Sequence, residues 1–485
     1  MTKRTTSLFV LTLLIVAMFA MVADAARVQD QLAAKLKAYA VMAEDPTTPS
    51  QSSKGSGAVA LCSYSSDGES PGYIVFRSYN DHPVWYDASN MIDWRHAAKI
   101  QMIYMAQFIG GDDELVAGRW PHHNKFDATV SPGGVFVNGP SGVPMYANPF
   151  TYTGGEPQLD VDNLGNMVSV SHSYIPVATG ETGNQRTAEV FWDVSGNGVF
   201  SGDTVPQSLS QNPEGSVAYP FIEFQENGGI FVTHVLATEF TPVRATTYWR
   251  RVGGNPTYQG WSTPLQLPQT GGGNAKICAA RGSQKVAIVY LGDLDPAEAG
   301  SMPFMILSDD MGATWDTTLT GEPNIIEVVN FDYASDGWSG WVDINAAYDS
   351  DDYLHIVWNS MEYDGVAGAQ VNSVNPTRIF HWSDRVAGPH SGGTVGIVAH
   401  VEFNFSSLCG RGWTNETNVA RTVIAECSDR LYVLWQQFGD PEFGDSLDCA
   451  SEDAIGFTGS YNSEIMMSVS LSKDGSLWDR RRNVT

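Results

Sequence analysis

Basic residues are scarce in this chain of 485 residues. Lysine and arginine number 27 against 54 aspartates and glutamates, which gives a formal net charge of −27. A surface of that sign repels phosphate backbones at long range, so the sequence argues against a nucleic-acid partner. Charged residues make up only 17% of the chain, whereas glycine (48) and proline (24) are plentiful. This composition is typical of many short strands joined by turns and not of long, charged helices.

Cysteine is also rare, with five residues in the whole chain. These are Cys62, Cys278, Cys409, Cys427 and Cys449. Their spacing matches no zinc-binding pattern, and five are too few for a disulfide scaffold. Three of them lie within residues 409–449, where one local disulfide can form, and the odd count leaves at least one thiol free or paired outside the chain. The pairing itself stays open.

The one strongly hydrophobic run stands at the N-terminus. Lys3 and Arg4 precede an apolar run over residues 8–22, and Ala23-Asp24-Ala25 then has the small-x-small pattern of a cleavage site. The run is shorter than the roughly 20 residues that a membrane span needs. We therefore predict a signal peptide over residues 1–25, a secreted or cell-surface protein, and no transmembrane segment after cleavage.

A short second region follows at residues 26–57. Within residues 27–44, Val28, Leu32 and Leu36 recur at helical spacing and predict one amphipathic helix. Residues 45–57 are rich in proline, serine, threonine and glycine, as linkers are. The pattern fits either a docked arm or a pro-segment.

From residue 58 to residue 485 the chain repeats one phrase, a turn followed by a mostly apolar strand. The cases are AKIQMIY (98–104), GNMVSVS (165–171), GGIFVTH (228–234), QKVAIVY (284–290), DYLHIVW (352–358) and DRLYVLW (429–435). A hairpin pattern with a Gly- or Asp-bearing turn follows each, at 124–137, 189–200, 248–261, 304–316, 379–390 and 466–479. Six such units predict an all-β, six-bladed β-propeller. A two-sheet sandwich is the alternative, but it does not account for the period.

Two of these hairpins carry nearly the same turn. Residues 307–316 read LSDDMGATWD and residues 471–479 read LSKDGSLWD. The shared positions are Ser308, Asp310, Gly312, Thr314 and Trp315 in the first turn, and Ser472, Asp474, Gly475 and Trp478 in the second. An Asp after a strand accepts backbone N–H bonds from the turn, and a Trp packs between sheets. A catalytic carboxylate has no need to recur at a fixed point of a repeat, so we interpret both turns as structural.

This phrase resembles the Asp-box of the sialidase-like (BNR-repeat) β-propellers. The resemblance implies a carbohydrate-related function and places the Asp-boxes on the rim, away from the active centre. The family's enzymes also have three arginines that bind the substrate carboxylate, a Tyr–Glu nucleophile pair and an Asp that acts as acid and base. An Arg-Ile-Pro motif on the first strands accompanies them. Arg-Ile-Pro is absent from this chain, and Arg77 lacks the flanking residues. We therefore transfer no catalytic residue.

Other polar clusters have simpler explanations. Asp193, Ser195 and Asn197 occupy positions 1, 3 and 5 of a calcium loop, but position 12 is Thr204 where a bidentate Glu is expected. A plain turn is favoured, with Ca²⁺ as the alternative, and no cofactor is required. His122 and His123 are neighbours on a predicted strand, so they point to opposite faces. His234 and His355 fit packed core positions.

The sequence thus predicts a secreted binding module for an extracellular glycan or protein. A glycoside hydrolase of the same fold with a diverged active site is the first alternative, and a structural or adhesive surface protein is the second. The chain ends shortly after Trp478. Further C-terminal domains are one expectation from this, and a ring that closes here is the other.

Overall fold

The computed structural model describes the strands and most of the tight turns between residues 92 and 484, with gaps at many connecting loops. Every described residue belongs to one compact unit, formed by Ser66–Phe405, Asn415–Phe438 and Ser463–Thr485. A second unit comprises Met1–Ser65, Ser406–Thr414 and Gly439–Asn462 and lies outside the described residues, as do the predicted signal peptide, helix and linker. Within the described ranges, no helix is long and apolar enough to span a membrane.

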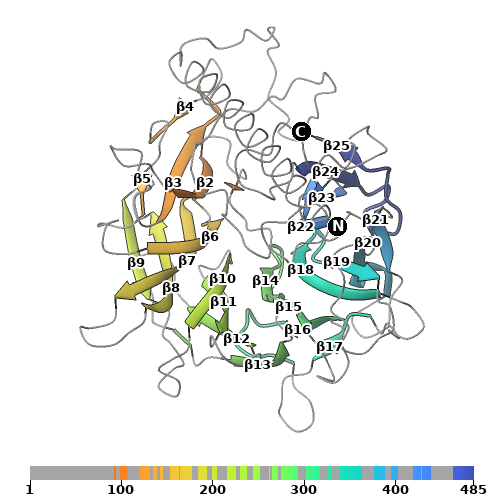
Figure 1. The fold of residues 1–485 in the computed structure, drawn as a ribbon, viewed down its shortest axis with the longest axis horizontal. Helices are drawn as coiled ribbons and strands as arrows, with labels where there is room; N and C mark the ends of the chain where they lie inside the picture. Colours follow the sequence, from red (N-terminus) through yellow and green to blue (C-terminus); the bar gives the residue numbers. More distant parts are fainter. Residues whose placement is uncertain are drawn as a thin grey trace, which may run out of the picture. The chain divides into compact units, whose positions relative to one another are not determined.

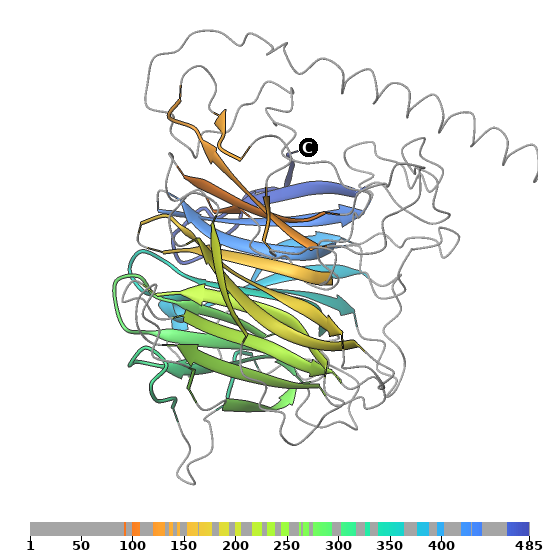
Figure 2. The same cartoon turned by 90° about the vertical axis from the view of Figure 1, so that its left-hand side faces the viewer.

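Five four-stranded antiparallel sheets follow one another along the chain, each with its strands in chain order (Figures 1 and 2). The first contains β6 (Thr153–Val161), β7 (Met167–Pro176), β8 (Asn184–Asp193) and β9 (Phe200–Thr204). The second contains β10 (Ser216–Phe224), β11 (Ile230–Ala237), β12 (Arg244–Arg251) and β13 (Leu265–Thr270). The third contains β14 (Ala275–Ala279), β15 (Val286–Gly292), β16 (Met302–Ser308) and β17 (Ile326–Glu327).

The last two sheets keep the same pattern. One contains β18 (Trp338–Tyr348), β19 (Leu354–Glu362), β20 (Thr377–Ser383) and β21 (Gly396–Val401), with the short helix α3 (Asp384–Ala387) after β20. The other contains β22 (Val419–Cys427), β23 (Arg430–Phe438), β24 (Ser463–Val469) and β25 (Arg482–Asn483). In Figure 1 the first strand of each sheet faces a common centre, and successive innermost strands are neighbours. This is a β-propeller arrangement, as the repeat predicted.

The prediction of six regular blades is corrected to five. The remaining described sheet is five-stranded and irregular: β1 (Ile92–Asp93), β2 (Ile100–Ala106) and β3 (Trp120–Asp127) are followed by two short strands, β4 (Val135–Phe136) and β5 (Val143–Pro144), which both pair with β3. Sequence chemistry explains the broken outer edge. Residues 138–142, between the two short strands, read NGPSG, a run of turn-forming residues that disfavours one continuous outer strand.

The second strand of each regular sheet forms the core. Strand β15 is buried along its whole length and β19 along all but its last residue, which is why these segments are apolar without alternation. Trp358 at the end of the repeated phrase packs with Phe380 of its own sheet, and both lie in one buried cluster with Leu291 of the preceding sheet. Apolar side chains therefore fill the space between neighbouring sheets, as blade packing requires.

Hydrogen bonds tie neighbouring sheets together at their turns. The Phe224 N–H donates to Asp160 Oδ2 at 2.6 Å. Two junctions further on, the Gly282 N–H donates to Asp352 Oδ1 at 3.1 Å. At the junction after that, the Ser350 N–H donates to Glu426 Oε2 at 2.6 Å. Each bond joins one sheet to the next along the chain, so polar contacts supplement the apolar packing.

Two of the five cysteines lie in the described residues, and the predicted local disulfide within residues 409–449 stays a prediction. Cys278 is a free, buried thiol, and burial raises its pKa well above the usual value. Cys427 forms a disulfide with a partner outside the described residues. At least one thiol is therefore free, as the odd count predicted.

Candidate functional site

The first candidate, the Ser308–Trp315 turn, is a closed set of hydrogen bonds. Asp310 Oδ1 accepts the Thr314 N–H at 2.8 Å, and Oδ2 accepts the Thr314 hydroxyl at 2.6 Å. Ser308 Oγ donates to Asp310 Oδ1 and accepts the Gly312 N–H, both at 2.9 Å. Gly312 has φ 68°, which glycine adopts without strain. Burial would raise the pKa of Asp310, but the bonds from Thr314 and Ser308 outweigh it and lower the pKa.

The second turn repeats this arrangement with one residue fewer. Ser472 Oγ donates to Asp474 Oδ1, which also accepts the Ser476 N–H at 3.0 Å. Gly475 has φ 67° and takes the place of Gly312. Trp478 packs against the buried cluster between the last two sheets, just as Trp315 packs against the cluster of its own sheet. These carboxylate oxygens accept hydrogen bonds from within their own turns, which supports a structural role for both turns.

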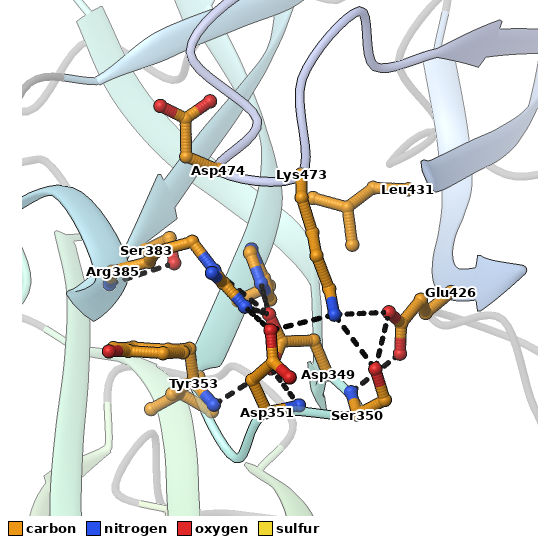
Figure 3. Close-up of polar contacts among 12 residues, drawn as sticks. Asp349, Ser350, Asp351, Tyr353, Ser383, Arg385, Glu426, Leu431, Lys473 and Asp474 are labelled. Atoms are coloured by element: carbon orange, nitrogen blue, oxygen red, sulfur yellow. Dashed lines mark hydrogen bonds and ion pairs between the residues drawn. The ribbon is translucent and has the colours of Figure 1, made fainter. Parts of the chain in front are cut away.

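A charged network joins the last two sheets at the same face (Figure 3). Arg385 of α3 donates from Nε (3.1 Å) and from a terminal nitrogen (2.7 Å) to Asp349 Oδ2, and also contacts Asp351 Oδ2 at 2.5 Å. Lys473, from the turn between β24 and β25, reaches Asp351 Oδ2 at 2.8 Å and Glu426 Oε1 at 3.2 Å. The charges are paired with one another, so the network acts as a seam between sheets.

The innermost strands carry a different feature, at the end of the strand away from these turns. Four of the five have a register shift of the β-bulge type against the second strand, between Gly155 and Gln158, Ala218 and Phe221, Gly340 and Ile344, and Ala420 and Val423. Bulges re-aim side chains and are common next to binding sites. Two of these bulges have a signal in the sequence, Pro157 in β6 and Pro220 in β10. Proline within a strand is tolerated only at a bulge or on an edge strand.

At the best-described bulge, a buried carboxylate holds the backbone of Arg421. Arg421 of β22 has φ 59°, an uncommon conformation for a residue with a side chain. Its N–H donates to Asp343 Oδ2 of β18, and its guanidinium donates to Gln436 Oε1 at 2.6 Å. Asn359 Nδ2 donates to the same Asp343 oxygen at 3.2 Å, and Asp343 is fully buried. A strained backbone held by a buried carboxylate is the kind of feature that clusters at functional sites.

Sequence reasoning found only part of this group. Arg421 is one of several arginines that lie in no recognisable sequence motif, and neither Asp343 nor Asn359 has a signal in the sequence. No glycine or proline marks this bulge, and the Asp343–Arg421 contact joins residues far apart in the chain. We therefore place the candidate site at the bulged ends of the innermost strands.

The other predicted site residues are not brought together. Asp193 is fully buried at the end of β8, whereas Ser195 and Asn197 lie outside the described residues, so the calcium prediction stays a prediction. His122 and His123 are both buried in β3. The described ranges contain no group of three His, Cys, Asp or Glu residues that could hold a metal ion.

No protein-family model matches this chain, and no curated protein sequence matches it significantly. Solved structures similar to it include the phage phi92 endosialidase (TM-score 0.44, 9% identity, covering 83% of this chain and 68% of that one). Another is the polysaccharide lyase Uly1 (TM-score 0.39, 12% identity, covering 84% of this chain and 93% of that one). A third is an α-L-arabinanase of Penicillium chrysogenum complexed with arabinobiose (TM-score 0.38, 8% identity, covering 68% of this chain and 92% of that one). These likenesses are too distant to assign an activity.

Proposed function

We propose that this chain is a secreted, sialidase-like β-propeller that binds an extracellular glycan at the bulged ends of its innermost strands. In this proposal the irregular β1–β5 sheet takes the place of a sixth blade, and the turns at Ser308 and Ser472 are Asp-boxes. The observation that supports it most is the recurrence of a bulge in four innermost strands, at the end opposite to the fastening turns. A surface-exposed protein is the other class of ligand that would fit.

The chemistry of the Arg421 group suits a ligand rich in hydroxyls. A sugar hydroxyl donates one hydrogen bond and accepts others, so it pairs equally with carboxylate, amide and guanidinium groups. At one bulge, Arg421 and Gln436 supply a guanidinium and an amide that are both partly exposed. The fully buried Asp343 and Asn359 lie behind them, and Asp343 accepts the Arg421 backbone N–H. The net charge of −27 opposes acidic polymers at long range, so the proposed ligand is a neutral glycan.

Glycan binding requires no catalytic residue, but Asp343 supports glycoside hydrolysis as a second candidate function. Glycoside hydrolysis ordinarily uses two carboxyl groups flanking the scissile bond, and a buried Asp at the bulge could supply one. The two functions make different predictions for the same variant. Asp343→Asn removes a general acid or base from an enzyme, whereas it keeps a hydrogen-bonding group in a binder.

The test is a screen of the mature chain against an array of neutral and acidic glycans, followed by titration calorimetry with each hit. The same preparation is incubated with fluorogenic glycosides and sialosides. We expect binding of a neutral glycan and no turnover. Turnover that Asp343→Asn abolishes would favour the hydrolase, and an array without hits together with no turnover would contradict both functions.

A further inference from the structure

One face of the last regular sheet is less covered than the faces of the other four. In those four sheets every described side chain of the second strand is buried, apart from Glu362 at the end of β19. In β23, the second strand of the last sheet, Val433 and Trp435 are buried. Leu434 and Gln436, which alternate with them, are partly exposed. Alternate residues of a strand point to opposite faces, so Leu434 and Gln436 share the more open face.

Two residues of β24 extend this open face. Ile465 is the register partner of Gln436 and is 37% exposed. Met467 is the register partner of Leu434 and is partly exposed. Directly opposite residues of an antiparallel pair lie side by side on one face, so an apolar surface borders the Gln436 amide.

The bulge in β22 adds a guanidinium to the same face. Two residues, Arg421 and Thr422, stand opposite one residue of β23, Trp435. The Arg421 guanidinium donates to Gln436 Oε1 at 2.6 Å, so both groups lie on the open face. Arg421 has φ 59°, and a bulge residue with positive φ is ordinarily a glycine. An arginine in this conformation points to a use for its side chain.

The polar side chains described at this end of the open face present hydrogen-bond donors. A guanidinium has five N–H donors and no acceptor. The bond from Arg421 engages the Gln436 oxygen, which leaves the NH₂ group as the part of the amide that binds a ligand. The acceptors Asp343 Oδ2 and Asn359 Oδ1 lie behind, in fully buried side chains that accept the Arg421 and Asp343 backbone N–H groups. A ligand for this face therefore has to accept hydrogen bonds.

A neutral acceptor fits this face better than an anion. The Asp343 carboxylate bound to the Arg421 backbone offsets the charge of the guanidinium, and the net charge of −27 opposes an anionic ligand at long range. The exposed Ile465 also disfavours a charged group, which would lose water there without gaining a partner. A carbonyl oxygen accepts two hydrogen bonds and carries no charge. In glycans, the acylamino group combines such a carbonyl with a methyl group.

We propose that Arg421, Gln436 and Ile465 form a subsite for the acylamino group of a neutral sugar, such as an N-acetylhexosamine. This inference rests on the proposed glycan-binding function and names the chemical class of ligand for that same site. The carbonyl oxygen accepts hydrogen bonds from the Arg421 guanidinium and the Gln436 amide. The methyl group packs on Ile465 and Leu434. Gln436 thus both positions the guanidinium and contacts the ligand.

Matched pairs of glycans on one array test the ligand class. The members of a pair share ring configuration and linkage and differ only in an acetamido or a hydroxyl group at one carbon, as chito- and cello-oligosaccharides do. We expect the mature chain to bind the acetamido member at least tenfold more tightly, with the ratio measured by calorimetry. Equal binding, or preference for the hydroxyl member or for a uronate, would overturn this inference and leave glycan binding in place. An array without any hit would contradict glycan binding and this inference together.

Gln436→Glu separates contact with the ligand from support of Arg421. Glutamate keeps an oxygen that accepts from the guanidinium but lacks the NH₂ donors. We expect affinity for the best acetamido glycan to fall at least tenfold, with the near-UV circular dichroism of the parent chain retained. A loss of less than twofold would show that Gln436 only supports Arg421 and would overturn the subsite.

A second pair of variants tests the apolar part of the subsite. Ile465 and Val469 lie on the same face of β24, but only Ile465 is the register partner of Gln436, whereas Val469 pairs with Tyr432. We expect Ile465→Ser to weaken binding of the acetamido glycan at least threefold and Val469→Ser to leave it within twofold. Equal effects of the two substitutions on affinity would contradict the placement of the acyl methyl group.

Discussion

The backbone of Gly475 lies directly against the ring of His381, so that a Cβ at position 475 would collide with three ring atoms. Gly475 also has φ 67°, so any side chain there is strained. We predict that Gly475→Ala lowers the free energy of unfolding by about 2–4 kcal/mol, the sum of backbone strain and overpacking. Urea denaturation of the mature chain measures this.

Gly312→Ala is the matched control, because Gly312 has nearly the same φ of 68° in the equivalent turn. Strain alone predicts a loss of about 1–2 kcal/mol there. If the two variants lose the same free energy of unfolding, the contact between Gly475 and His381 adds nothing to the loss. The inference of tight packing between the last two sheets at this point would then be wrong.

Asp310 is predicted to act on stability and not on ligand binding. Its carboxylate accepts bonds from Thr314 and Ser308, so Asp310→Ala leaves those donors to solvent and should cost about 1–2 kcal/mol. The neighbouring Asp309 contributes none of these bonds, and Asp309→Ala should stay within about 0.5 kcal/mol of the parent chain. Thermal unfolding of both variants checks the difference, which a catalytic role for Asp310 would not predict.

Asp429 offers a stabilising substitution. It is an exposed residue with φ 65° in the turn before β23. Glycine adopts this φ freely, so we predict that Asp429→Gly raises the free energy of unfolding by about 0.5–1 kcal/mol. Asp429→Ala keeps a Cβ in the strained conformation and should not stabilise. A gain of equal size in both variants would point to the charge of Asp429 instead of its backbone.

His123 should make the fold sensitive to acid. Burial, the largest cause, lowers its pKa from 6.5 to about 4, and Lys125 adds to this while Asp193 opposes it. A folded pKa below the unfolded one means that stability is fully present above pH about 6.5 and is lost as the pH falls toward 4. The loss attributable to His123 reaches about 3 kcal/mol at most.

The measurement for His123 compares urea unfolding of the parent chain and of His123→Gln at pH 7, 5.5 and 4.5. Glutamine does not titrate and can still pair with Gln101, the partner of His123 Nε2 at 2.7 Å. The variant should be less stable at pH 7 and lose less stability on acidification. Parallel curves for the two proteins would show that His123 does not titrate between the folded and unfolded states.

The sequence predicted the repeated strands well, because burial on both sides leaves a clear apolar signature. The phrases ending at Tyr290, Trp358 and Trp435 coincide with β15, β19 and β23. The irregular first sheet was harder to predict, since its AKIQMIY phrase looks like the others and only the outer edge differs. The hairpin expected over residues 379–390 also contains a short helix, α3, in place of a simple turn.

The candidate site was mostly beyond sequence reasoning. Pro157 and Pro220 are local signals of a bulge, but Arg421 adopts a positive φ with no glycine to indicate it. The Asp343–Arg421 contact and the His381–Gly475 contact depend on how neighbouring sheets pack. Periodicity within one sheet carries no information about such contacts.

The central claim is that a ligand binds at the bulged ends of the innermost strands and not at the fastening turns. The most direct measurement is a pair of dissociation constants, by calorimetry with the best glycan from the array, for Arg421→Gln and Asp310→Ala. We expect Arg421→Gln to weaken binding at least tenfold and Asp310→Ala to leave it within twofold. Unchanged binding in Arg421→Gln together with lost binding in Asp310→Ala would contradict the account.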